Sequence, residues 1–120
     1  MNEIIFHSSS GGNEPLAEYI KDLRQKAVTD KDARIRLIKI IAYIDLLEEY
    51  GTQVGEPVVK HLKDSIWELQ PLRIKILFSR YKDNIYILLH HTVKNTDKTP
   101  LYEITYAERN LIDFIERSAA

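Results

Sequence analysis

The sequence predicts one α+β domain, in which helices pack on a mainly antiparallel sheet. Apolar residues recur at a helical spacing of about 3.6 over residues 15–50, at a strand spacing of about two over residues 65–93, and at the helical spacing again after residue 99. The chain has 120 residues, of which 44% are hydrophobic and 29% are charged, as in a single globular domain. We therefore expect one domain over residues 1–120.

The first half of the sequence predicts a strand and a helical hairpin. The strand is the apolar run of residues 4–6, and the loop after it is rich in Ser and Gly. A first helix is expected from Pro15, and a second from Asp30 or Asp32 to Gly51. The apolar stripe that we assign to the core of the second helix contains Ile35, Ile38, Ile41, Ala42 and Leu46. Another apolar stripe, which suits either a partner or a second buried side, contains Leu37, Ile40, Ile44 and Leu47.

The second half predicts a sheet and a last helix. Three strands are expected to form an antiparallel meander over residues 65–69, 73–80 and 84–93. A final helix opens at Thr99-Pro100, although Thr105 and Glu108 match a capping box that would start it later. The predicted sheet thus combines the N-terminal strand with a three-strand meander, packed by the helical hairpin.

Several classes of protein are excluded by the composition. The absence of cysteine excludes a disulfide scaffold, a zinc ribbon and a thiol nucleophile. No apolar run approaches the roughly 18 residues of a transmembrane helix, and the N-terminal run is too short for a signal peptide, so we expect a cytoplasmic protein. His90 and His91 do not stand at metal-ligand spacing with other side chains, and we expect neither a metal nor a cofactor.

The basic charge is concentrated on the predicted strands. The net charge of the whole chain is -1, which by itself argues against a nucleic-acid partner. By segment, however, the net charge is -3 for residues 1–59, +4 for residues 60–98 and -2 for residues 99–120. The meander is therefore the part of the chain suited to an anionic partner.

Strand alternation places several polar residues on one face of the predicted sheet. Arg73 and Lys75 alternate with apolar residues that pack on the helices, so both should point to the opposite, open face, together with Glu68 and His90. His91 should point the other way and be partly buried, unless the strand ends or bulges there. On the last strand we expect Ile85, Ile87 and Leu89 toward the helices, and Tyr86, Leu88, Thr92 and Lys94 on the open face. Cations on a wet sheet face are also common without any function.

The residue types on this face suit cleavage of RNA by its own 2'-hydroxyl. The hydroxyl must lose a proton to a base such as Glu or His, and the leaving 5'-oxygen must gain one from an acid such as His. Arg and Lys would stabilise the negative charge of the transition state. This reaction requires no metal.

Three stretches of the sequence resemble a known family. They are IWELQPLRIKILF at residues 66–78, LLHHTVKNTDKTP at residues 88–100 and EITYA at residues 103–107. They are similar to the patterns W-E-L-R-P-L-R, L-L-H-H-F-x-K-K-T-Q-K-T-P and E-I-x-x-A of the HigB-like toxins. These toxins belong to the RelE/ParE superfamily and are the toxic halves of bacterial type II toxin-antitoxin modules.

The resemblance implies a RelE-like fold and a cytoplasmic, ribosome-dependent mRNA endoribonuclease that inhibits translation. It also implies neutralisation by a HigA-like helix-turn-helix antitoxin, which would be the only link to DNA. With the face analysis, it makes Arg73, Lys75, His90 and Glu68 the expected catalytic residues. The expected RNA-binding residues are Lys94, Lys98, Lys60 and His91. Glu56, in a stretch similar to one in the YoeB branch, is an alternative to Glu68 as base.

Four positions depart from the family pattern and leave alternatives open. Gln70, Thr92, Asn95 and Asp97 stand where the family has Arg, Phe, Lys and Gln, and three of these changes remove or oppose positive charge. Affinity for RNA should therefore be weaker than in a typical relative. The alternatives are a catalytically weakened homologue and a ParE-like inhibitor that acts on DNA gyrase by protein binding.

Overall fold

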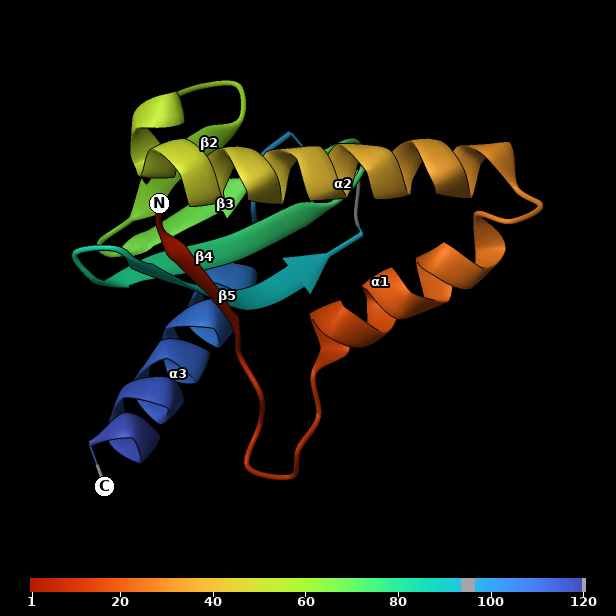
Figure 1. Ribbon diagram of the computed structural model, residues 1–120. Coiled ribbons are helices and arrows are strands. Elements are labelled where there is room, and N and C mark those ends of the chain that lie inside the picture. Colours follow the sequence, from red (N-terminus) through yellow and green to blue (C-terminus); the bar gives the residue numbers. More distant parts are fainter. Residues whose placement is uncertain (94–96, 120) are drawn as a thin grey trace.

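The computed structural model describes residues 1–93 and 97–119. It shows a five-stranded sheet with helices on both faces (Figure 1). The strands are β1 (Glu3–Phe6), β2 (Val59–Lys63), β3 (Ile66–Leu69), β4 (Lys75–Lys82) and β5 (Ile85–Thr92). The helices are α1 (Pro15–Lys26), α2 (Lys31–Tyr50), a 3-10 turn η1 (Gly51–Val54) and α3 (Leu101–Ser118). None of the helices in the described ranges has the length and apolar content that crossing a membrane requires.

The strand order is β1-β5-β4-β3-β2. Strands β2 to β5 form an antiparallel meander, and β1 pairs with β5 in parallel because the hairpin of α1 and α2 carries the chain across the sheet. The N-terminal strand and the three predicted strands are confirmed. Strand β2 was not predicted, because it is a mostly polar edge strand whose register shifts between His61 and Lys63.

The helix boundaries follow from local chemistry. The Asp30 carboxylate accepts hydrogen bonds from the backbone N–H groups of Asp32 and Ala33, at 2.9 and 3.3 Å, and so caps α2. Gly51 ends that helix with φ +65°, in the left-handed region that favours glycine. Helix α3 begins at Leu101, directly after Pro100, which confirms the earlier of the two predicted starts.

The buried side of α2 is not the predicted one. The second apolar stripe faces the sheet: Ile40 and Leu47 are fully buried, and Leu37 and Ile44 pack beside them. In the stripe that we assigned to the core, Ile35 and Ile38 are exposed. Both stripes have the helical period, so only packing against the sheet distinguishes them.

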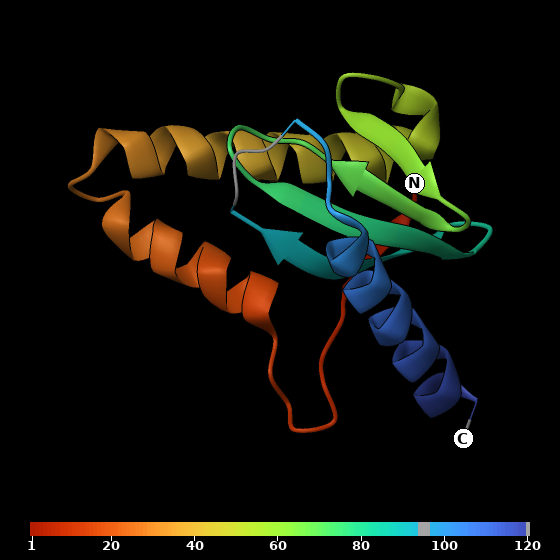
Figure 2. The same ribbon diagram turned by 180° about the vertical axis from the view of Figure 1, so that it is seen from behind.

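The sheet face that we expected to be open is covered in part by α3. Figures 1 and 2 show α2 above the sheet and α3 below it. Ile87 and Leu89 pack under α3 with Ile104 and Ala107, whereas Tyr86 and Leu88 pack under the hairpin. The predicted sides of these β5 residues are therefore reversed. Both sides of this central strand are apolar, so alternation alone did not tell which helices each side meets.

We expect Ile40→Ala and Ile38→Ala to differ sharply in stability. Ile40 is fully buried, and its truncation should lower the free energy of unfolding by about 2–5 kcal/mol. Ile38 is 62% exposed, and the same change there should cost less than about 0.5 kcal/mol. Urea denaturation of both variants measures the difference, and equal losses would contradict the observed orientation of α2.

Candidate functional site

His90 and His91, near the end of β5, line one hollow at the edge of the sheet from opposite faces. The register of β4 with β5 shifts, so that Leu77 lies opposite His90 while Phe78 lies opposite Leu88. Leu89 packs under α3, and the next residue, His90, also contacts α3. The bulge thus places Leu89 and His90 on the face under α3, while His91, opposite Ile76, points to the other face and is partly buried, as alternation predicted.

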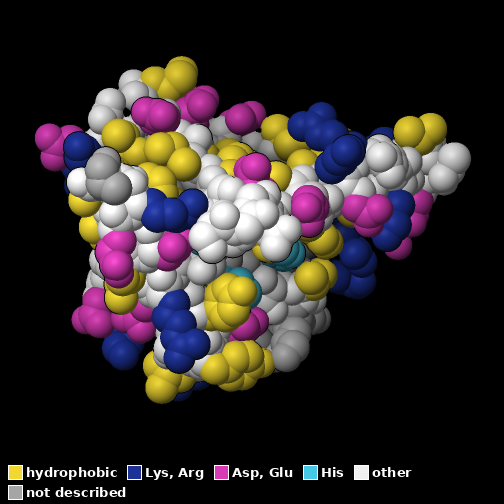
Figure 3. Space-filling model, turned by 90° about the horizontal axis from the view of Figure 1, so that it is seen from below, with side chains coloured by type: hydrophobic (Ala, Val, Ile, Leu, Met, Phe, Trp, Pro, Cys, Tyr) yellow, Lys and Arg dark blue, Asp and Glu magenta, His cyan; other side chains and the backbone are white. Residues whose placement is uncertain are grey.

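The hollow has a volume of about 150 Å³ and lies where β1 leaves β5. Its walls are the loop after β1, the start of α1, the end of β5 and one side of α3. Figure 3 shows histidine side chains recessed among hydrophobic and acidic ones on this side of the molecule. The polar lining residues are His7, Ser9, Asn13, His90, His91, Tyr106 and Asn110.

His90 is held between two side chains of α3. Its Nε2 lies 3.1 Å from Oε1 of Glu103, and the two side chains are 18% and 12% exposed. The Tyr106 ring lies 4.5 Å from the His90 ring, centroid to centroid, at an angle of 31°. Glu103 and Tyr106 therefore fix the orientation of the imidazole, and the exposed Tyr106 forms the outer rim.

His91 faces the hairpin side. Its ring lies 5.2 Å from the ring of Tyr19 on α1 and 6.5 Å from the ring of His90. Burial lowers the pKa of His91, and the neighbouring His90 lowers it further, against a smaller opposing effect of Glu103. His91 is therefore a neutral imidazole at pH 7.

A buried polar network lies on the same sheet face, just before α3. The Thr99 hydroxyl donates a hydrogen bond of 2.5 Å to Oε1 of Glu68 and accepts one of 3.1 Å from Nζ of Lys75. Gln70 donates from its side-chain amide to the other oxygen of Glu68. Glu68 is 1% exposed and Lys75 is 8% exposed. Our prediction that both lie on an open surface is therefore wrong. The two opposite charges are bridged by one hydroxyl.

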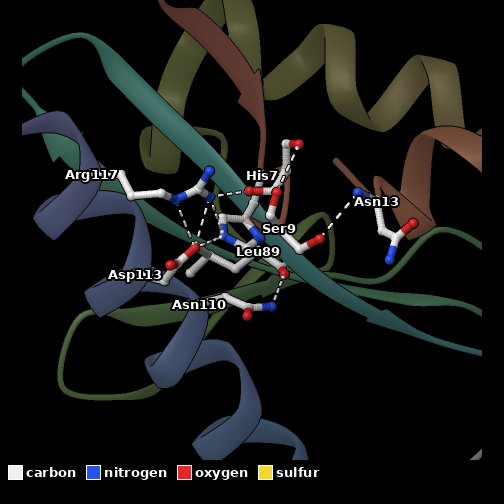
Figure 4. Close-up of polar contacts among 8 residues, drawn as sticks. His7, Ser9, Asn13, Leu89, Asn110, Asp113 and Arg117 are labelled. Carbon is white, nitrogen blue, oxygen red and sulfur yellow. Dashed lines mark hydrogen bonds and ion pairs between the residues drawn. The ribbon is translucent and has the colours of Figure 1, made fainter. Parts of the chain in front are cut away.

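The opposite wall of the hollow is fixed by His7. Its Nε2 lies 2.9 Å from Oδ2 of Asp113, which also accepts a hydrogen bond of 2.7 Å from Arg117 (Figure 4). The hydrogen bond with His7 lowers the pKa of Asp113, and the one from Arg117 adds to this. Asn110 donates to the Leu89 carbonyl at 2.8 Å. Together these contacts attach α3 to β1 and β5.

Arg73 does not lie on a strand beside Lys75. It belongs to the turn before β4, has φ +61°, is exposed, and lines a different hollow with Asp32 and Arg36 of α2. Alternation from Arg73 failed because β4 begins only at Lys75. The structure thus brings Glu68 and Lys75 together, places His90 under the same helix α3, and leaves Arg73 outside this group.

The predicted RNA-binding residues are more scattered. Lys60 is exposed on β2, opposite Glu68 in the register, and Lys98 is exposed next to Thr99. Lys94 lies outside the described residues. Glu56 is exposed in the turn before β2, at the sheet edge farthest from β1.

Sequence reasoning missed most of the residues that surround His90. Glu103 was inside the quoted stretch EITYA and Thr99 inside TDKTP, but we interpreted both only as part of a pattern or a helix start. His7 carried no pattern, because its partners lie more than 100 residues away in the sequence. Among the residues that the structure describes, no three side chains are grouped as ligands for a metal.

A match to a family model covers most of the chain. Residues 18–111 match the family model described as "Phage derived protein Gp49-like (DUF891)", and the chain belongs to this family. It is a toxin-like family of type II toxin-antitoxin systems, related in kind to the RelE and HigB toxins. The match covers the chain from α1 to most of α3, including His90, His91 and Glu103. No curated protein matches the chain.

We expect Thr99→Val to destabilise the fold. It leaves the buried carboxylate of Glu68 and the buried ammonium of Lys75 each without one hydrogen bond, which should cost about 1–3 kcal/mol of unfolding free energy. Thr105→Val, on the half-buried side of α3, is the matched control and should change stability by less than about 0.5 kcal/mol. If denaturant titration gives the same free energy of unfolding for both variants, the Thr99 bridge contributes nothing to stability.

The lowered pKa of His91 should make stability depend on pH. As the pH falls below about 6.5, the unfolded chain takes up a proton at this residue that the folded chain resists, so the free energy of unfolding decreases. His91→Gln should reduce this loss on acidification. His61→Gln, at an exposed position, is the control and should leave it unchanged. Identical pH dependence of the wild-type chain and His91→Gln would contradict the prediction.

Proposed function

We propose that the chain is the toxin of a type II toxin-antitoxin module and acts as a ribosome-dependent mRNA endoribonuclease. Cutting of mRNA would inhibit translation, and a cognate, HigA-like antitoxin would neutralise the protein. Membership of the Gp49-like family supports the toxin class. The arrangement around His90 supports the nuclease chemistry.

The observation that carries this proposal is the pairing of His90 with Glu103 at the hollow. In a neutral His90 imidazole, the nitrogen Nε2 can carry the proton and donate it in a hydrogen bond to the Glu103 carboxylate. The other nitrogen, Nδ1, is then the one that can accept a proton. A base that is oriented by a third group is the usual arrangement for activating a hydroxyl nucleophile. His90 is therefore the proposed proton-transfer residue, and Glu103 its positioning residue.

The proposed reaction is an in-line displacement at phosphorus. His90 takes the proton of the RNA 2'-hydroxyl, whose oxygen forms a bond to phosphorus while the bond to the 5'-oxygen breaks. The 5'-oxygen leaves with a proton returned by the imidazolium or by water, which gives a 2',3'-cyclic phosphate and a free 5'-hydroxyl. His91, as a neutral ring beside it, would bind the RNA rather than exchange its proton.

The surface next to His90 suits single-stranded RNA. Tyr102 and Tyr106 are more than half exposed and stand one turn apart on α3, where they line a shallow hollow with Arg109. Exposed aromatic rings beside cations bind successive bases by stacking and the backbone by charge. Lys98 and Lys60 are exposed and would add phosphate contacts.

Glu68 and Lys75 have an indirect role in this proposal. Both are buried and bonded to Thr99, so they do not reach substrate in this structure. They fix Thr99 and hence the start of α3, from which Glu103 and Tyr106 reach His90. The weak cationic surface agrees with an enzyme that acts on mRNA already held by the ribosome.

We expect His90→Ala to abolish mRNA cutting while the chain stays folded. Loss of a positioned proton-transfer group typically costs a factor of about 10² to 10⁴ in rate. The measurement is mapping of mRNA 5'-ends after induction of the chain in a bacterial host, with melting of the purified variant as the folding check. His61→Ala, an exposed histidine on β2, is the matched control and should cut like the wild-type chain.

Two results would contradict the proposed function. One is a full set of cuts by a folded His90→Ala variant. The other is growth arrest with intact transcripts and trapped gyrase-DNA breaks, which would favour the ParE-like alternative. Glu103→Gln provides a further check, because a positioning carboxylate should change the pH profile of cutting and not only its rate.

A further inference from the structure

A second hollow lies on the hairpin side of the sheet, away from His90. It has a volume of about 420 Å³ and lies between α2 and the turn before β4. We call it the α2 groove, and its lining residues are Asp32, Ile35, Arg36, Leu72 and Arg73. The helix α3, which holds the RNA-facing side chains of the proposed function, is on the other face of the sheet.

The α2 groove carries unused positive charge. In the described part of the chain, the guanidinium groups of Arg36 and Arg73 have no hydrogen bond or ion pair with another residue. Asp32 is the only carboxylate among the described lining residues, so the groove has a net positive charge. Arginine presents a planar fork of donors that matches a carboxylate in a two-bond arrangement.

The groove also carries exposed apolar surface. Ile35 is 44% and Leu72 43% exposed, and Ile38, one turn further along α2, is 62% exposed. Leu72 and Arg73 both have positive φ, 23° and 61°, a conformation that residues other than glycine adopt at a cost. The turn therefore keeps both side chains beside α2 at the expense of backbone strain.

We propose that the α2 groove binds an acidic segment of the antitoxin that also carries aliphatic side chains. Arginine together with exposed aliphatic residues is typical of protein interfaces, where the guanidinium pairs with carboxylates and apolar side chains are removed from water. The phosphates of RNA would use the two arginines but would leave Ile35, Ile38 and Leu72 in water. This inference rests on the proposed function, because it takes the partner to be the antitoxin.

The location has a consequence for neutralisation. The α2 groove shares no lining residue with the His90 hollow, and it lies on the other side of the sheet from α3. The antitoxin would then bind without filling that hollow.

The test is the affinity of purified chain for its cognate antitoxin, identified as the protein whose co-expression restores growth. The groove variant combines Arg36→Glu with Ile35→Gln, and calorimetry should show binding at least about tenfold weaker, with a smaller salt dependence. The matched control combines Arg24→Glu with Val28→Gln at exposed positions of the hairpin, and it should bind like the wild-type chain. Without antitoxin, the groove variant should cut mRNA as the wild-type chain does.

A second variant protects the test against a folding defect. Arg73→Glu changes only one exposed side chain, and it should weaken antitoxin binding in the same direction. Wild-type affinity in both Arg73→Glu and the groove variant would overturn the inference. So would a groove variant that binds antitoxin normally but no longer cuts mRNA, because the groove would then contact RNA or the ribosome.

The two proposals can fail separately. If the wild-type chain cuts no mRNA but its antitoxin binding depends on Arg36 and Arg73, the proposed nuclease is wrong and the groove assignment holds. If the wild-type chain cuts mRNA and the groove variants bind antitoxin normally, only the groove assignment is wrong.

Discussion

The hydroxyl of Thr99 is the contact on which the functional side of this fold depends. It joins β3, through Glu68, to β4, through Lys75, and it lies two residues before α3 begins. Two buried side chains of opposite charge would be costly without such a partner, so the bridge offsets their burial and fixes where the last helix starts. From that start, Ile104 and Ala107 reach the core and Glu103 reaches His90. One small side chain thus links stability to the geometry of the site.

The two faces of the sheet have different tasks in the proposals. The face under α3 holds Glu68, Lys75 and His90, and the hollow at the edge of the sheet is lined by His90 from this face and by His91 from the other. The face under the hairpin carries the larger part of the apolar core and, at its rim, the α2 groove with Arg36 and Arg73. A toxin that must act on RNA and be silenced by a protein gains from such a separation, since neither surface constrains the other.

Local patterns of the sequence were sufficient for most of the fold and for part of the site. Both ends of α2 and the start of α3 could be predicted, because Asp30, Gly51 and Pro100 act on the backbone next to them. Which side of α2 is buried could not be predicted, since Ile38 and Ile40 belong to two apolar stripes that have the same helical spacing. Arg73 was misplaced because alternation cannot show at which residue a strand begins. The partnership of His7 with Asp113 joins opposite ends of the chain, and no local pattern encodes it. His90 was predicted on the sheet face of Glu68 and Lys75, and it lies on that face, under α3.

Helix α3 supplies Glu103, Tyr106 and Asn110, and it is synthesised after β5, which carries His90. A nascent chain that already contains β5 therefore has His90 without the carboxylate and the ring that hold it. Since chains fold from the N-terminal end as they emerge, the surroundings of His90 are completed only after α3 has been synthesised. In the proposed function, the order of elements along the chain would act as a timer, because His90 lacks its positioning residue until α3 has emerged and packed on β5.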